Sequence, residues 1–403
     1  MRVLIVGINY APEPTGIAPY TTGLAAALRR RGDEASVITG YPHYPAWRVT
    51  AGYRGLTRRE TIDGVPVKRV RHYVPSSPRL INRLLMELTF GVRAAFAGWA
   101  RPDAVIVVSP ALFSSRIVLA RARLSRARRI VWVQDLYGPG VAETGQATGR
   151  VAHTLAAFER STLQHGDRIV VIHDRFKKHL VDDLGLDPER VDVVRNWSHL
   201  ADIRSSERAA VRHRLGWADD DVVVLHAGNM GAKQGLENVV HAARLAAERG
   251  SRVRFVLVGD GNRRAVLEQL LESLGGCERL TFVPPLDDNE FRPTLAAADI
   301  LLVNERPGLA EMCVPSKLTT YFSTGLPVLA ATDAGSVTAD EIAVSGGGMR
   351  IDAGDPEALL NGAERLGADA ELRAFLGASG RDFKAEFLSE DAAVDGFLAA
   401  LAH

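Results

Sequence analysis

Short runs of consecutive apolar residues recur along the chain and alternate with longer segments whose apolar residues fall at helical spacing. Such runs are typical of strands buried on both faces of a parallel sheet. In the first half, the pattern predicts strands at residues 3–6, 35–39, 65–70, 104–108, 130–133 and 168–172, with helices at 18–31, 81–100, 114–125 and 151–165. In the second half, it predicts strands at 222–225, 253–258, 280–283, 300–303 and 328–331. The alternation favours open, doubly wound parallel sheets.

The pattern runs twice, which predicts two α/β domains that face each other across a cleft. We expect an N-terminal domain over 1–195, a linker over 196–220, a C-terminal domain over 221–385 and a terminal helix over 386–403. A return of that helix to the N-terminal domain is left open. Neither half has G-x-G-x-x-G directly after its first strand, which counts against a nicotinamide dehydrogenase. Ligands of such folds bind at the carboxyl ends of the strands.

The stretch 221–243 combines a buried strand, a glycine turn and a helix start. Gly228-Asn229-Met230-Gly231 breaks the chain after the strand, and a helical pattern opens at Gln234-Gly235-Leu236. Glycines let the backbone approach a ligand, and the unpaired N–H groups of a helix start favour a phosphate. Lys233 could add a positive charge. A tight turn without a ligand fits the local sequence equally well.

A second signal in this half is the segment 314–321, in which Pro315-Ser316 is typical of a helix start. Lys317 falls in the first turn, where a cation opposes the helix dipole. We therefore interpret Lys317 as a group that neutralises a bound diphosphate, with a solvated lysine as the alternative. Thr319 and Thr320 offer hydroxyl groups to a ribose or a sugar.

In the first half, Gly16 ends the loop after the first strand and would set the next helix start over the cleft, although a plain turn glycine is an equal alternative. Asp135 follows the predicted strand 130–133, where a carboxylate is costly unless it is paired or functional. We interpret Asp135 as functional, with a hydrogen bond to the following loop as the alternative.

Composition is that of a globular protein, with 46% hydrophobic and 24% charged residues among 403. Two cysteines fit a reducing cytoplasm, and we expect neither a signal peptide nor a membrane-spanning helix. Residues 1–200 hold 29 Lys and Arg against 17 Asp and Glu, whereas 201–403 hold 20 against 31. The basic half predicts an anionic partner, for which a membrane surface or a phosphorylated substrate fits at least as well as nucleic acid, because the basic residues lack interleaved aromatic residues and a recognisable reading motif. The arginine-rich segments 79–101 and 116–129 contact such a membrane, or else their apolar sides belong to the core and their arginines form a solvated face.

Together, the opening GINYAPEPTGIAPY, the QDLY segment, the GNMGAKQGLE loop and VPSKLTTYF resemble retaining glycosyltransferases of family 4. The resemblance covers essentially the whole chain and implies the GT-B fold, with two doubly wound Rossmann-like domains facing across a cleft. Within the family, the motifs are similar to bacterial enzymes of the colanic-acid and O-antigen type. Those move a fucose- or N-acetylfucosamine-like sugar to a lipid-linked acceptor.

The resemblance also implies roles for individual residues. The implied donor-binding residues are Gly16, Gly228, Asn229, Lys233, Gln234, Gly261, Arg263, Pro285, Leu286, Ser316, Thr319 and Thr320. The implied catalytic residues are Asp135, Lys317 and Glu311, and the implied acceptor-side residues are His43, Tyr44 and Tyr137. The chain departs from the family where arginine, lysine, histidine and the second glutamate are usual, because it has Asn229, Gln234, Gln134 and Thr320 there. The cationic role then moves to Lys233 or Lys317.

The function so implied is transfer from a nucleotide-sugar, most simply a UDP-sugar, to a lipid-linked glycan acceptor in polysaccharide biosynthesis. We expect no cofactor and no metal, a cytoplasmic protein and a peripheral contact with the inner face of the membrane. A transferase with a soluble acceptor and a GT-B sugar-nucleotide epimerase are alternatives. A two-lobed sugar-binding protein is a third, against which the cationic donor site argues.

Overall fold

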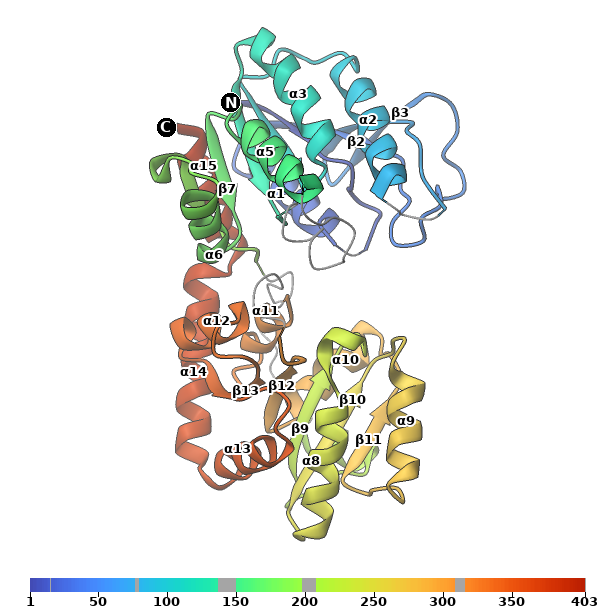
Figure 1. The fold of residues 1–403 in the computed structure, drawn as a ribbon, viewed down its shortest axis with the longest axis vertical. Coiled ribbons are helices and arrows are strands. Elements are labelled where there is room, and N and C mark those ends of the chain that lie inside the picture. Colours follow the sequence, from blue (N-terminus) through green and yellow to red (C-terminus); the bar gives the residue numbers. More distant parts are fainter. Residues whose placement is uncertain (15, 77–79, 137–149, 198–207, 309–315, 403) are drawn as a thin grey trace. The chain divides into compact units, whose positions relative to one another are not determined.

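The computed structural model describes residues 1–14, 16–76, 80–136, 150–197, 208–308 and 316–402, and its elements are labelled in Figure 1. The chain divides into two compact units. Unit 1 comprises Met1–Asn196 and Glu390–His403, and unit 2 comprises Trp197–Ser389.

Unit 1 is built on an eight-stranded sheet in the order β3-β4-β2-β1-β5-β6-β7-β8. All neighbouring strands are parallel except β3 and β4. The central β5 is buried along its whole length, as expected for a strand covered on both faces. The strands are β1 (Arg2–Val6), β2 (Glu34–Gly40), β3 (Thr57–Ile62), β4 (Val65–Val70), β5 (Ala104–Ser109), β6 (Arg128–Val133), β7 (Arg168–Val171) and β8 (Val191–Val193).

The last helix, α15, belongs to unit 1 although it follows unit 2 in the chain, and Figure 1 shows it beside β7. Phe397 is fully buried and meets the ring of Trp132 edge-on at 4.7 Å between centroids. Ion pairs join Arg31 of the α1 C-terminus to Asp391 and Asp395. The helices of unit 1 are α1 (Ala18–Arg30), α2 (Leu80–Ala95), α3 (Leu112–Ser125), α5 (Arg150–Leu163), α6 (Asp174–Lys178) and α15 (Glu390–Ala402).

Unit 2 contains a six-stranded, all-parallel sheet in the order β11-β10-β9-β12-β13-β14. Successive residues of β9 alternate between two cores. Val223 and Leu225 pack on one face with α7, α10, α11, α12 and α14, and Val224 packs on the other with α8, α9 and α13. The strands are β9 (Val222–Ala227), β10 (Val253–Val258), β11 (Leu280–Val283), β12 (Ile300–Asn304), β13 (Val328–Ala331) and β14 (Gly348–Ile351).

Helices α8 to α12 connect successive strands of unit 2 as crossovers, as a parallel sheet requires, whereas α7 precedes β9 and α13 and α14 follow β14. They are α7 (Arg208–Leu215), α8 (Glu237–Glu248), α9 (Arg264–Ser273), α10 (Asp288–Ala297), α11 (Ser316–Phe322), α12 (Val337–Ser345), α13 (Pro356–Ala368) and α14 (Ala370–Phe387).

The elements differ from the predicted ones at the edges of each unit. The helix expected over 81–100 ends at Ala95, and Gly98 follows with a φ of +72°. Residues 208–215, inside the segment expected to be a linker, form α7, whose Arg212 pairs with Asp299 of unit 2. Strands β3, β8 and β14 were not predicted because they are short or lack an apolar face. Among the described residues, no helix is long and apolar enough to cross a membrane.

Candidate functional site

In each unit, strand order changes direction at one point, and polar groups gather there at the carboxyl ends of the strands. In unit 1 this point lies between β1 and β5, and in unit 2 it lies between β9 and β12. Ligands of open α/β sheets bind at such switch points. The two candidate sites are therefore the loops after β1 and β5 and the loops after β9 and β12.

The glycine loop after β9, residues 228–231, packs backbone to backbone against the loop after β10. Gly228 N–H donates to Val258 O at 2.8 Å, and Met230 N–H donates to Asp260 O at 2.8 Å. A Cβ atom at Gly259 would overlap the carbonyl of Gly228, and one at Gly261 would lie 2.5 Å from Met230 O. The two loops thus stay in contact only because both positions are glycine.

Lys317 reaches this loop from the first turn of α11. A Cβ atom at Gly228 would lie 3.0 Å from the Lys317 Cε atom, and Gly228 has a φ of +126°, so a side chain there would crowd Lys317 and strain the backbone. The Nζ atom lies 3.3 Å from Nε2 of His226. Burial lowers the pKa of Lys317 to about 8, against the opposing effect of Glu305. Lys317 is thus a half-buried cation held at a strand end.

Tyr321, one helical turn after Lys317, fixes α11 to the same strand end. The backbone N–H of Ala227 donates to the Tyr321 hydroxyl at 2.9 Å, and Tyr321 is buried. Residues four apart share one face of a helix, so Lys317 and Tyr321 both point to the end of β9. The packing of α11 against β9 therefore fixes the backbone position from which Lys317 extends.

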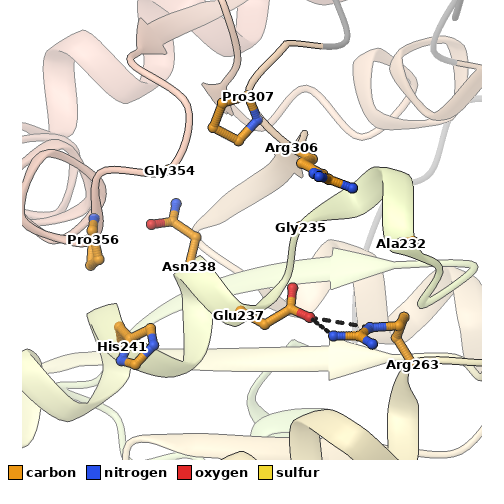
Figure 2. A pocket seen from close by; sticks show the side chains of 10 residues that line it. All are labelled: Ala232, Gly235, Glu237, Asn238, His241, Arg263, Arg306, Pro307, Gly354 and Pro356. Atoms are coloured by element: carbon orange, nitrogen blue, oxygen red, sulfur yellow. Dashed lines mark hydrogen bonds and ion pairs between the residues drawn. The ribbon is translucent and has the colours of Figure 1, made fainter.

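Several predicted donor-binding side chains have protein partners. Gln234 Oε1 accepts the N–H of Gly231 at 3.0 Å, which makes this side chain part of the loop's own framework. Figure 2 shows Arg263 directed at Glu237 at the side of a cavity of 440 Å³ behind the loop, with Arg263 Nε and Glu237 Oε1 3.2 Å apart. Lys233 and Asn229 are exposed at the loop surface.

The other donor-side predictions surround the same strand ends or lie outside the described residues. Pro285 is exposed, and Leu286 packs against the core beneath α10 and α11. Thr319 and Thr320 are half-buried on α11. Ser316 begins α11, but its side chain, like the whole of Glu311, lies outside the described residues.

In unit 1, a cavity of 320 Å³ opens between the loops after β1, β2 and β5 and helix α2. Gly16 and Tyr44 line it together, and a Cβ at Gly16 would meet the Tyr44 ring at 3.4 Å. The buried Glu13 fixes this wall, because its Oε1 accepts the N–H groups of His43 at 2.8 Å and Tyr44 at 2.9 Å. His43 is buried and Tyr44 is exposed.

Helix α2 closes the other side of this cavity with Arg83 and Glu87. Burial raises the pKa of Glu87 to about 7, although the N–H of Phe113 and the charge of Arg83 act in the opposite direction. Glu87 Oε2 accepts the Phe113 N–H at 3.0 Å. A carboxyl group near its pKa at neutral pH can both donate and accept hydrogen bonds from a hydroxylated ligand.

We expected Asp135 at the end of a buried strand, where a carboxylate is costly, but the structure places Asp135 in an exposed position. Strand β6 ends at Val133, and Asp135 is exposed, with Oδ1 accepting the Leu136 N–H at 2.9 Å. The preceding Gln134 is buried and exchanges two side-chain hydrogen bonds with Asn196. A role for Asp135 stays a prediction. Tyr137 lies outside the described residues.

Sequence reasoning missed three groups at these sites, namely His226, Glu13 and Glu87. His226 ends an apolar run and Glu87 interrupts an apolar helix face, so each was a polar residue at a position predicted to be buried. Such a residue needs a partner or a role, which is the signal that could have found it. The described residues contain no group of three or more His, Cys, Asp or Glu side chains arranged to hold a metal ion.

Comparison with protein families gives a match over both units. Residues 15–197 match the glycosyl transferase 4-like domain, and residues 207–383 match the glycosyl transferases group 1 domain. A protein of Escherichia coli K12 named as a colanic acid biosynthesis glycosyl transferase, WcaI, is 34% identical over 338 residues, which are 81% of this chain and 82% of that protein.

Solved structures share the fold over the whole chain. The Anabaena protein Alr3699/HepE in complex with UDP has a TM-score of 0.73 at 16% identity and covers 100% of both chains. WaaG, a glycosyltransferase involved in lipopolysaccharide biosynthesis, has a TM-score of 0.65 at 17% identity and covers 98% of both chains. At these identities, the likeness establishes two Rossmann-like α/β domains of the GT-B type.

Gly259→Ala tests the backbone contact between the two loops. The added methyl group overlaps the Gly228 carbonyl, so we expect unfolding free energy to fall by more than about 2 kcal/mol. The measurement is denaturant unfolding. Gly276→Ala is the control, because Gly276 also has a positive φ but open space around it, and about 1 kcal/mol is expected there. Equal losses in the two variants would contradict the contact.

Glu87→Gln tests the raised pKa of the buried Glu87 carboxyl group through the pH dependence of stability. The pKa of Glu87 is raised in the folded state, so its contribution to stability is complete below its ordinary pKa of 4.5 and is lost as pH rises through about 7. We expect the wild type to lose on the order of 3 kcal/mol relative to Glu87→Gln between pH 4.5 and 8.5. Parallel unfolding curves at several pH values measure this. The exposed Glu189→Gln should show no such trend, and a flat difference for Glu87→Gln would refute the shift.

Proposed function

This chain belongs to the GT-B glycosyltransferases that join a 4-like domain to a group 1 domain, and on that premise we propose that it transfers a hexosyl group from a UDP-sugar to a lipid-linked glycan acceptor. The transfer retains the anomeric configuration and belongs to cell-surface polysaccharide biosynthesis. The observation that carries the proposal is Lys317 held over the glycine loop at the switch point of unit 2.

The donor leaves as a nucleoside diphosphate, so the site must stabilise developing negative charge. Lys317 offers a desolvated ammonium group, and an ion pair in such surroundings is stronger than one in water. The glycine loop allows a phosphate close to its backbone. We propose that these groups act without a metal ion. The bond between the anomeric carbon and the diphosphate breaks, the acceptor oxygen bonds to that carbon from the same face, and the hydroxyl proton goes to the departing diphosphate. The UDP complex of the HepE structure supports uracil as the base of the donor.

The acceptor is proposed to enter the cavity of unit 1. Its exposed Tyr44 and the adjacent Trp47 offer aromatic faces to a sugar ring, and Glu87 and Arg83 offer hydrogen bonds to hydroxyl groups. The names of WcaI and WaaG, which refer to colanic acid and lipopolysaccharide biosynthesis, favour a glycan carried on a lipid.

The apolar outer face of helix α2 is an argument for an acceptor that is carried on a lipid. Four large side chains of α2 and Phe96, which directly follows the helix, form the α2 stripe: Ile81, Leu85, Leu88, Val92 and Phe96, spaced four, three, four and four residues apart, with Ile81 71% and Phe96 84% exposed. The inner face of the same helix lines the cavity with Arg83, Met86 and Glu87. The exposed Arg93 adds charge to the outer face. An amphipathic surface of this kind suits an anionic membrane, which would bring the carrier to the cavity.

A nucleotide panel tests the donor site. We expect UDP, but not GDP, dTDP or ADP, to raise the melting temperature equally with and without magnesium, because a ligand of the folded state stabilises it by mass action. Lys317→Ala should weaken UDP binding at least about tenfold, as expected for loss of a charge-assisted contact. Lys384→Ala removes a lysine from α14 of the same unit and serves as control. No shift with any nucleotide would refute the donor assignment.

A vesicle assay tests the α2 stripe. Replacing Ile81, Leu85 and Phe96 with serine should lower binding to vesicles of anionic phospholipid by about tenfold or more, because each removes apolar surface that would enter the lipid. Co-sedimentation measures the bound fraction. Phe375→Ser removes a side chain of α14 that is 66% exposed and should leave binding unchanged. Unchanged binding of the triple variant would exclude this helix as the membrane contact.

A further inference from the structure

His226 occupies an unusual place for an ionisable residue, because it is fully buried next to the last residue of β9. Its Nδ1 atom lies 3.2 Å from the carbonyl oxygen of Leu302 in β12. A carbonyl only accepts hydrogen bonds, so Nδ1 carries the hydrogen. In a neutral imidazole, Nε2 then holds a lone pair.

That lone pair faces Lys317, whose Nζ atom is 3.3 Å from Nε2. An ammonium group only donates, so Nε2 accepts one of its N–H groups. Burial, and then the charge of Lys317, hold the pKa of His226 well below its ordinary value, whereas the carbonyls of Leu302 and Asn229 act in the opposite direction. Thus His226 stays neutral while Lys317 is charged.

Two other titratable groups face this pair. Glu305, which follows β12, favours the charged form of Lys317, and its carboxylate accepts the hydroxyl hydrogens of Thr332 and Thr338. Tyr321 of α11 is buried, which raises the pKa of its hydroxyl and keeps it neutral. In the part of the chain that the structure describes, Lys317 forms no ion pair with a carboxylate, and its Nζ contact is with His226.

We propose that His226 is a positioning residue, which holds the ammonium group of Lys317 at the glycine loop without neutralising it. A carboxylate at this place would fix Lys317 equally well but would cancel the charge that a diphosphate needs. A neutral imidazole uses one of the three N–H groups and leaves two for the ligand. This inference rests on the proposed contact between Lys317 and the donor diphosphate.

Two substitutions separate the two nitrogens of His226. His226→Asn keeps a donor near the position of Nδ1, so the bond to Leu302 can persist, but it has no atom that reaches Lys317. His226→Gln places an amide oxygen near the position of Nε2 and can accept from Lys317. Both variants are polar and of similar or smaller volume, so packing should survive.

The experiment is the pH dependence of UDP binding by calorimetry, between pH 6.5 and 9.5. Wild-type affinity should fall as pH rises through about 8, because Lys317 loses its charge. In His226→Asn, an acceptor that favours the charged form is gone, so the midpoint should move down by about one pH unit, which lowers the affinity at pH 8 about fivefold. His226→Gln should stay within about twofold of wild type. A merely structural role would weaken binding without moving the midpoint.

A ligand-free measurement distinguishes failure of this inference from failure of the proposed function. The chain has only six lysines, so the Lys317 signal can be assigned in the NMR spectrum of ¹³C-lysine-labelled protein by comparison with Lys317→Arg. Its pKa should fall in His226→Asn even if UDP does not bind. Thr324→Ala, which removes a buried hydroxyl that donates to the carbonyl of Tyr321 at the end of α11, keeps the groups that face the ammonium group and should leave that pKa unchanged. An unchanged Lys317 pKa in His226→Asn would overturn the proposal.

Discussion

The site in unit 2 depends on the contact between two glycine loops. Gly259 approaches the Gly228 carbonyl so closely that it cannot carry a side chain, and hydrogen bonds from Gly228 to Val258 and from Met230 to Asp260 join the two loops. This contact fixes the end of β9, and the fixed end gives α11 a rigid partner. Lys317 can therefore point at one place, which is the condition for electrostatic stabilisation without reorganisation.

Charge is managed differently in the two units. In unit 1, the side chain of the buried Glu13 fixes a loop by accepting hydrogen bonds from the backbone N–H groups of His43 and Tyr44. In unit 2, the acceptor facing Lys317 is the neutral His226. The difference follows from what each site has to present. The loop in unit 1 needs only a fixed conformation, whereas the proposed diphosphate site also needs a positive charge that no carboxylate neutralises.

Helix α2 joins the acceptor cavity to the surface, since one face lines the cavity and the other carries the α2 stripe. A single rigid helix thus sets the distance between a hydroxylated ligand and an apolar surface. For the proposed lipid-linked acceptor, this arrangement would keep the lipid in the membrane and bring only the sugar into the protein. The basic composition of the first half fits the same surface.

The sequence by itself determined the two sheets and their glycine turns, because buried parallel strands are continuous apolar runs that need no tertiary context to be seen. It also contained the β3–β4 hairpin, whose Asp63-Gly64 turn has positive φ at both residues, but the polar β3 hid it. Only the tertiary structure decided which polar groups work together. The Lys317–His226 contact joins residues 91 positions apart, and the pairing of Arg263 with Glu237 depends on how two helices pack. Spacing along a chain cannot give such contacts, since they arise when separate elements meet.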